Sequence, residues 1–288
     1  MVTTAQRRAV VAEYRGAARS ERQVCAWLNV PRATVRYRSR RAPPQALVAR
    51  LTKLAGDKPR WGSPRLTWRL RRDGAMVNHK RIERLLREER LLVGQRRRRK
   101  QAASVRVPAP TPTQANERWS MDFVRDTLRA GRPFRVWTLV DDATRESPLL
   151  VTDHSLPAAR VVEALEFLRT TRGLPRAIVC DNGPEFVSQA LDEWAARHGV
   201  ALSFIRPGHP VENCFIESFN GKLRDECLNL HHFATLAEAQ ERIEAWRVEY
   251  NTERPHRGLG QRTPIEYADV LRDHESERRN PFLRRELA

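Results

Sequence analysis

The chain has 288 residues, 40% of them hydrophobic, so it can bury a sizeable core in one large domain or in two to three small ones. No apolar run approaches the roughly 20 residues that cross a bilayer, and the first residues lack the apolar core of a signal peptide, which argues against a membrane-spanning or secreted protein. Four scattered cysteines without a C-x-x-C pair argue against a disulfide framework or a zinc site, so we expect a protein of the reducing cytoplasm.

The net charge of +18 is unevenly distributed. Residues 1–110 contain 29 Lys and Arg against 7 Asp and Glu, a net charge of +22, whereas residues 111–288 contain 24 against 28, a net charge of −4. This division predicts a phosphate-binding front end joined to a nearly neutral second domain. A solubilising basic arm is the alternative. Binding to a membrane surface is less favoured, because no lipidation motif or amphipathic anchor accompanies the charge.

The segment 5–40 has the pattern of short helices. Ser20 is a suitable N-cap for apolar residues at helical spacing over 21–28, a turn follows at 29–31, and a second helix is predicted over 32–38. The arrangement resembles a helix-turn-helix, although many small helical hairpins share it. The second helix carries three candidate DNA-binding cations, Arg32, Arg36 and Arg38.

Three more helices are predicted over 45–56, 64–73 and 79–92. A run of five cations follows, and then a stretch with three prolines. Because like charges repel and proline stiffens the chain, we expect an extended linker and a domain boundary over 95–114. The five cations are further candidate DNA contacts: Arg96, Arg97, Arg98, Arg99 and Lys100.

The second half has the pattern of an α/β fold. Three strands separated by short turns predict an antiparallel meander, after which helices and short apolar strands alternate. The predicted strands are 119–128, 134–141, 146–152, 177–180 and 200–205. The predicted helices are 156–171 with Ser155 as its cap, 186–198, 212–229 and 236–250. Together they predict a mixed sheet with helices on its faces. We expect five tryptophans to be core or half-core: Trp27, Trp61, Trp68, Trp194 and Trp246.

Three carboxylates occupy unlike positions in this pattern. Asp122 interrupts an aromatic and apolar strand, Asp181 directly follows an apolar strand, and Glu217 shares a helix face with Asn220 and Arg224. A buried lone aspartate is costly unless it is paired or bound to metal, and strand ends are where α/β sheets place ligands. Carboxylates suit Mg²⁺ or Mn²⁺, and two ions ~3.5–4 Å apart support in-line displacement at phosphorus. Alternatively, Asp181 caps a turn and Glu217 faces solvent.

The residues around these carboxylates resemble a known family. Two sequence motifs are similar to those of the DDE integrase/transposase core: Asp181-Asn182-Gly183-Pro184-Glu185-Phe186 and Glu217-Ser218-Phe219-Asn220-Gly221-Lys222. So are the segments 116–123, 140–145, 205–213 and 250–256. More narrowly, the chain resembles the second-frame (OrfB) transposases of insertion sequences of the IS-three type, densely over 116–267 and more loosely before it.

This resemblance implies an RNase H-like catalytic core, a mixed sheet flanked by helices, over 115–272. It would be preceded by an all-α, helix-turn-helix-like segment (1–42) and a helical DNA-binding subdomain (43–94), and followed by a charged tail (273–288). Asp122, Asp181 and Glu217 would be the catalytic, metal-binding triad for Mg²⁺ or Mn²⁺. Arg224 would contact DNA near the cleavage site, and Lys222 in the same motif and His209 in a Pro/Gly loop are further candidates.

Such enzymes cut DNA at the ends of their element and join the freed 3′-hydroxyl to target DNA. We therefore expect double-stranded DNA as partner, a homo-oligomer on DNA and a nucleoid location. An upstream-frame (OrfA) protein could also take part, because the chain lacks leucine-zipper heptads. Trp61-Gly62-Ser63-Pro64 departs from the family's usual Tyr-Gly-Tyr-Arg-like stretch. The alternatives are a metal-dependent nuclease without strand transfer and a non-catalytic DNA-binding regulator or remnant.

Overall fold

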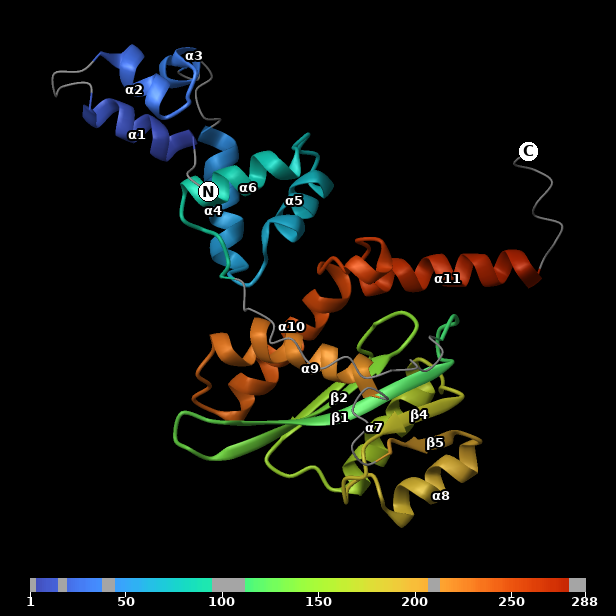
Figure 1. Ribbon diagram of the computed structural model, residues 1–288. Coiled ribbons are helices and arrows are strands. Elements are labelled where there is room, and N and C mark those ends of the chain that lie inside the picture. Colours follow the sequence, from blue (N-terminus) through green and yellow to red (C-terminus); the bar gives the residue numbers. More distant parts are fainter. Residues whose placement is uncertain (1–3, 15–19, 38–44, 95–111, 207–212, 280–288) are drawn as a thin grey trace. The chain divides into compact units, whose positions relative to one another are not determined.

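The computed structural model describes residues 4–14, 20–37, 45–94, 112–206 and 213–279. The chain divides into two compact units, residues 1–50 and 51–288, which are described separately below (Figure 1). Most of the predicted linker, with its run from Arg96 to Lys100, lies outside the described residues, as do Arg38 and His209. The predicted domain limits remain predictions.

The first unit contains three helices, α1 (Thr4–Tyr14), α2 (Glu21–Trp27) and α3 (Arg32–Arg36). Ser20 and Gln23 form a reciprocal capping box at the start of α2, as the N-cap prediction required. Val11 of α1 packs with Val24 and Cys25 of α2. The prediction that Trp27 is buried was wrong: it is 62% exposed, because it lies outside the stripe that faces α1.

Three helices precede the sheet: α4 (Gln45–Asp57), α5 (Ser63–Arg72) and α6 (His79–Glu88). Pro64 stands in the first turn of α5, where its missing N–H costs no hydrogen bond. The helix α6 is shorter than predicted, because Arg90 adopts a left-handed φ of 59° just past its end. The residues buried along these helices are Leu51, Leu66, Leu70, Ile82, Leu85 and Leu86.

The predicted mixed sheet is confirmed (Figure 1). Its strands are β1 (Arg118–Thr127), β2 (Pro133–Asp141), β3 (Leu150–Asp153), β4 (Ala177–Cys180) and β5 (Ala201–Phe204). Their order is β3-β2-β1-β4-β5, with β1, β2 and β3 antiparallel and with β4 parallel to both β1 and β5. The central strand β1 therefore joins the meander to the parallel half of the sheet.

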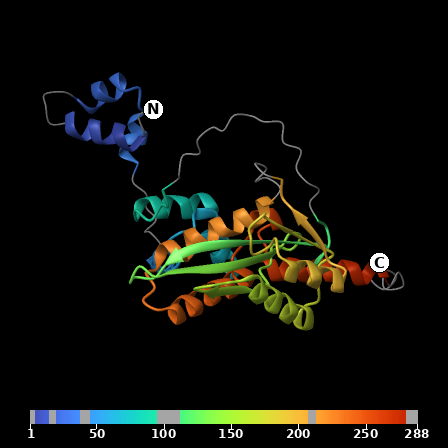
Figure 2. The ribbon, with the colours of Figure 1, turned by 90° about the horizontal axis from the view of Figure 1, so that it is seen from below.

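Helices cover both faces of this sheet, as Figures 1 and 2 show. Helices α7 (Ala158–Thr171) and α8 (Gln189–His198) pack on the face that carries Trp119 and Met121. Helices α9 (Cys214–Glu226) and α10 (Leu236–Thr252) pack on the face that carries Val124. Because side chains alternate along a strand, Asp122 points to the same face as Val124, towards α9.

Several helix ends differ from the predictions. The helix α7 begins at Ala158 with Pro157, not Ser155, as its N-cap, and α8 begins only after the capping Ser188. A further helix, α11 (Pro264–Arg279), was not predicted and runs into the expected tail. Its sequence signal is a capping box in which Thr263 and Glu266 exchange side-chain and backbone hydrogen bonds. None of the described helices is long and apolar enough to cross a bilayer.

Candidate active site

Asp122 and Asp181 are brought together by the sheet. In the parallel pairing of β1 with β4, Ser120 lies opposite Val179. Continuing this register by two residues places Asp122 opposite Asp181, which directly follows the last residue of β4. Two carboxylates, separated by 58 intervening positions in the chain, thus meet where the parallel strand β4 ends.

Helix α9 adds the third carboxylate. Asn220 Nδ2 donates a hydrogen bond of 2.8 Å to Asp122 Oδ2, which fixes one face of α9 over the centre of β1. Glu217 lies one helical turn earlier on this face, and its side chain is exposed. The helix α9 is held in place by its apolar seam of Ile216, Phe219 and Leu223, which packs on the sheet.

The charges of Asp181 and Glu217 both act on Asp122. Burial raises the pKa of Asp122, and the charges of Asp181 and Glu217 raise it further, against hydrogen bonds from the Phe123 N–H and from Asn220 that favour the ionised form. Burial also raises the pKa of Glu217. This destabilisation of the ionised carboxylates is of the kind that a bound cation relieves.

The loop after β4 is tied to β1 and β2. The Gly183 N–H donates to Asp181 Oδ1 at 3.0 Å, and a Cβ at Gly183 would lie only 3.0 Å from the same oxygen. Phe186 stacks on Phe123 with ring centroids 4.9 Å apart. Arg135 of β2 covers the other part of this cluster, with its guanidinium 4.2 Å from the Phe123 ring and paired with Glu185. Asp181 therefore stands on a loop that is anchored beside Asp122.

Within the described residues, no three His, Cys, Asp or Glu side chains approach closely enough to form a ready metal-binding group. Asp122 and Asp181 lie side by side by register, and Glu217 is close enough to perturb Asp122. The arrangement brings the predicted triad into one neighbourhood without closing it into a coordination sphere.

The candidate DNA contacts lie in different settings. Arg32 and Arg36 are exposed on α3, and both pair with Glu21 of α2. Arg224 is exposed in the last turn of α9, on the flank that carries Glu217. Lys222 is half-buried and donates to the Ser218 carbonyl and hydroxyl at 2.8 and 2.7 Å.

Two contributors to the site were missed from the sequence. The sequence analysis placed Asn220 on the same helix face as Glu217 but did not predict its hydrogen bond to Asp122. The available signal was an amide side chain three residues after Glu217 on a polar helix face. Arg135 gave no signal, because its pairing with Glu185 depends on strand β2 lying beside the loop that follows β4.

Comparisons with known proteins agree with this architecture. Two integrase core domain models match residues 112–210 and 198–264, and an HTH-like domain model matches residues 45–100. A protein described as an uncharacterized 31.7 kDa protein of insertion element IS407, from Burkholderia multivorans, is 44% identical over 250 residues, which cover 86% of this chain and 90% of that protein. The chain belongs to the insertion-sequence transposases of the IS-three type.

This transposase has further relatives. A putative transposase InsK of insertion sequence IS150, from Escherichia coli, is 26% identical over 226 residues, covering 73% of this chain and 78% of that protein. A chain of the simian T-cell lymphotropic virus intasome superposes with a TM-score of 0.51 at 15% identity, covering 76% of this chain and 74% of that one, which shows the shared fold. The transposase is a DDE-type enzyme. Its HTH-like match falls on the segment predicted as the second helical subdomain.

Proposed function

We propose that this transposase cuts DNA at the ends of its element and transfers the freed 3′-hydroxyl to target DNA, with Asp122, Asp181 and Glu217 as its catalytic triad. The observation that carries the assignment is the hydrogen bond from Asn220 to Asp122, since it places the Glu217 face of α9 against the pair formed by Asp122 and Asp181. The charges of Asp181 and Glu217, which add to the larger effect of burial in raising the pKa of Asp122, support the same assignment.

The donor set fits divalent metal ions. Hard cations such as Mg²⁺ or Mn²⁺ prefer carboxylate oxygens, and a cation between the three acids would stabilise the ionised form of Asp122, whose pKa is raised by burial and also by the charges of Asp181 and Glu217. The Asn220 Oδ1 atom is buried and accepts no hydrogen bond from the described residues, so it would be free to accept one from a water bound to such an ion. Two ions at this place would activate the attacking oxygen and stabilise the leaving one.

The remaining roles belong to the chain's own side chains. Asn220 orients Asp122, and the cluster of Arg135, Glu185 and Phe186 fixes the loop that carries Asp181. Arg224 extends the Glu217 flank of α9 by two turns and is exposed, so it is placed to contact a DNA phosphate beside the cleavage site. The exposed Arg32 and Arg36 of α3 supply further phosphate contacts, and assembly of several copies on DNA, with or without an upstream-frame protein, belongs to the same proposal.

The test is the substitution Glu217→Gln, which removes a charge and keeps the shape. We expect this variant to bind DNA but to cleave a labelled element-end duplex much more slowly. Loss of a residue that only supports a metal ligand costs about 10–100-fold in activity, and loss of a ligand itself should cost more. The matched control is Glu241→Gln on the exposed face of α10, which should cleave like the wild type. Wild-type cleavage by Glu217→Gln would refute the triad.

A second readout separates transposase from nuclease chemistry. The labelled end is incubated with a target plasmid, with and without the upstream-frame protein, and joined products are resolved on a gel. Joined product that is lost in Glu217→Gln supports strand transfer by the same site. Cleavage without any joined product under either condition would assign the chain to the nucleases instead.

A further inference from the structure

A cavity of about 680 Å³ opens on the flank of α9 that does not carry Glu217. Four parts of the second unit form its wall: the residues leading into α5, the loop after β2, α9 itself, and the segment from the end of α10 through the short helix η3 (Arg257–Leu259). The helix contributes Phe215, Ser218 and Lys222. None of the three proposed catalytic carboxylates lines the cavity, so it is a separate site.

The wall of this cavity is strongly positive. Among the described residues that line it there is no aspartate or glutamate, whereas six are cationic. The six are Arg60, Arg65, Arg145, Lys222, Arg254 and Arg257. Such a concentration of one sign of charge in one concave place favours an anionic ligand.

Three of the six cations pair with two carboxylates behind the wall, Glu226 and Asp225. Glu226 accepts hydrogen bonds from Arg254 at 2.6 and 2.7 Å and from Arg65 at 2.9 Å. Arg60 pairs with Asp225 at 2.8 Å. These contacts give the cavity a rigid frame, and the two carboxylates do not balance its six cations.

Arg145, Lys222 and Arg257 form no ion pair with any carboxylate of the described chain. Arg145 Nη1 is buried and donates no hydrogen bond to the described residues, which is costly unless a ligand accepts it. Lys222 donates only within its own helix, to Ser218. The cavity thus holds a guanidinium donor, Arg145 Nη1, that lacks an acceptor among the described residues.

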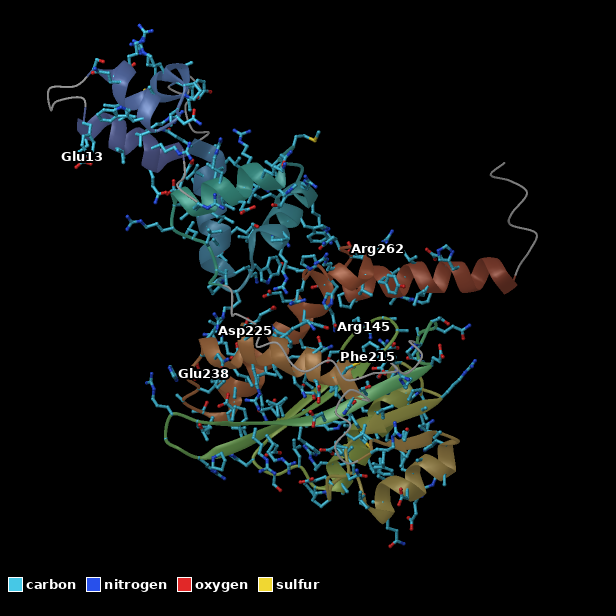
Figure 3. All side chains as sticks on the ribbon, viewed as in Figure 1. Glu13, Arg145, Phe215, Asp225, Glu238 and Arg262 are labelled. Atoms are coloured by element: carbon cyan, nitrogen blue, oxygen red, sulfur yellow. The ribbon has the colours of Figure 1, made fainter. Side chains whose placement is uncertain are left out.

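Arg145 is also held in position before any ligand arrives. Its guanidinium lies 3.7 Å from the centroid of the Phe215 ring, and Figure 3 shows the two side chains next to each other. Its backbone adopts a left-handed φ of 63°, which is unusual for arginine, and its N–H donates to the Asp141 carbonyl. A planar guanidinium fixed in this way is suited to a phosphate.

We propose that this cavity binds a phosphate group of a DNA strand through Arg145, Lys222 and Arg257. The proposal rests on the proposed function in one respect, that DNA is the substrate. A DNA phosphate is favoured over a free one because the cavity and Glu217 lie on two flanks of the same helix, so a strand that reaches Glu217 can be held from the other flank of α9.

The ionisation of the surrounding groups agrees with a positive potential. Burial, and next the charge of Arg254, lower the pKa of Lys222 to about 7. Burial and the charges of Arg254 and Lys222 likewise lower the pKa of His256, which keeps this lining residue neutral. A phosphate in the cavity would relieve the repulsion among these cations.

The test compares the full-length wild type with Arg145→Gln/Lys222→Gln in binding a labelled DNA duplex over a range of salt concentrations. We expect the slope of log K against log salt to become shallower by about 0.9 for each phosphate contact that is lost, and the affinity to fall on the order of tenfold. The control double variant Arg132→Gln/Arg197→Gln removes two exposed cations that do not line the cavity and should keep the cavity's contribution to the slope. Lys222→Arg, which keeps the charge, should bind with the wild-type slope.

Each variant is first checked by thermal unfolding, and a second arm adds inorganic phosphate to the wild type and the double variant. A slope and an affinity of the Arg145→Gln/Lys222→Gln variant equal to those of the control would overturn the proposal. Inorganic phosphate that binds in the cavity should raise the Tm of the wild type. If the double variant loses this rise but binds DNA like the wild type, the DNA assignment is overturned in favour of free phosphate. Glu217→Gln should retain the full slope, so a failure of the cleavage assay is distinguishable from a failure of this site.

Discussion

The buried acid Glu226 offers a quantitative test of the packing behind the active-site helix. Its side chain is 8% exposed, and Arg254, which donates two hydrogen bonds to it, is 2% exposed. Although burial alone raises the pKa of Glu226, hydrogen bonds from Arg254 and the charges of Arg254 and Arg65 lower it overall. Glu226→Gln removes the negative charge that pairs with Arg254 and Arg65, and it leaves the buried Arg254 without a carboxylate partner.

Removing one partner of a buried ion pair costs about 3–5 kcal/mol. Since 1 kcal/mol shifts the Tm of a domain of this size by about 2–4 °C, we expect Glu226→Gln to melt roughly 6–20 °C below the wild type. Glu253→Gln is the matched control: Glu253 pairs with Arg69 but is 45% exposed, so the same change should cost at most about 1 kcal/mol.

The sign of the pH dependence follows from the lowered pKa of Glu226. A carboxylate whose pKa is lower in the folded state stabilises the fold above its unfolded pKa of about 4.3, and this contribution is lost as the pH falls below that value. The difference in Tm between the wild type and Glu226→Gln should therefore be large at pH 7 and shrink towards pH 3. The assay is calorimetry or circular dichroism at both pH values. A variant within about 1 kcal/mol of the wild type at pH 7 would refute the reasoning.

Two more predictions concern the neighbouring polar groups. Asn220→Ala removes a hydrogen bond to a charged carboxylate, an interaction of about 1.5–3 kcal/mol, so DNA cleavage should slow by roughly 10- to 150-fold and need more Mg²⁺, with DNA affinity unchanged. The exposed Asn229→Ala is the control, and a wild-type rate for Asn220→Ala at every Mg²⁺ concentration would contradict its positioning role. For His256, burial and the charge of Arg254 lower the pKa to about 2 in the folded state. The unfolded chain therefore takes up a proton below its pKa of about 6.5 while the folded protein does not, and the free energy of unfolding falls by about 1.36 kcal/mol for each pH unit below that value. Between pH 7 and pH 5, the free energy of unfolding measured with urea should fall by about 2 kcal/mol less in His256→Gln than in the wild type. The control His231→Gln, at an exposed histidine, should show the same fall as the wild type. A fall in His256→Gln equal to that of the wild type would count against a neutral buried imidazole.

Local sequence patterns predicted most of the secondary structure. Alternating apolar residues located β1 and β2 to within a residue or two, and the N-cap Ser20 marked where α2 begins. The failures have particular causes. The start of α7 was misplaced because Pro157 displaces the cap from Ser155, and Trp27 was misjudged because apolar character does not reveal which side of a short helix has a neighbour.

For the candidate site, the sequence alone was enough to name the proposed catalytic residues: Asp122, Asp181 and Glu217 were chosen from their neighbours and from a family resemblance that the comparisons bear out. What only the tertiary structure decided is how these residues meet. The bond from Asn220 to Asp122, the anchoring of the Asp181 loop by Arg135, and the convergence of Arg145 and Lys222 on one cavity join residues that are 98, 46 and 77 positions apart. Local sequence encodes strand and helix periodicity, but contacts over such separations depend on register and packing, which are set only when the sheet and its helices assemble.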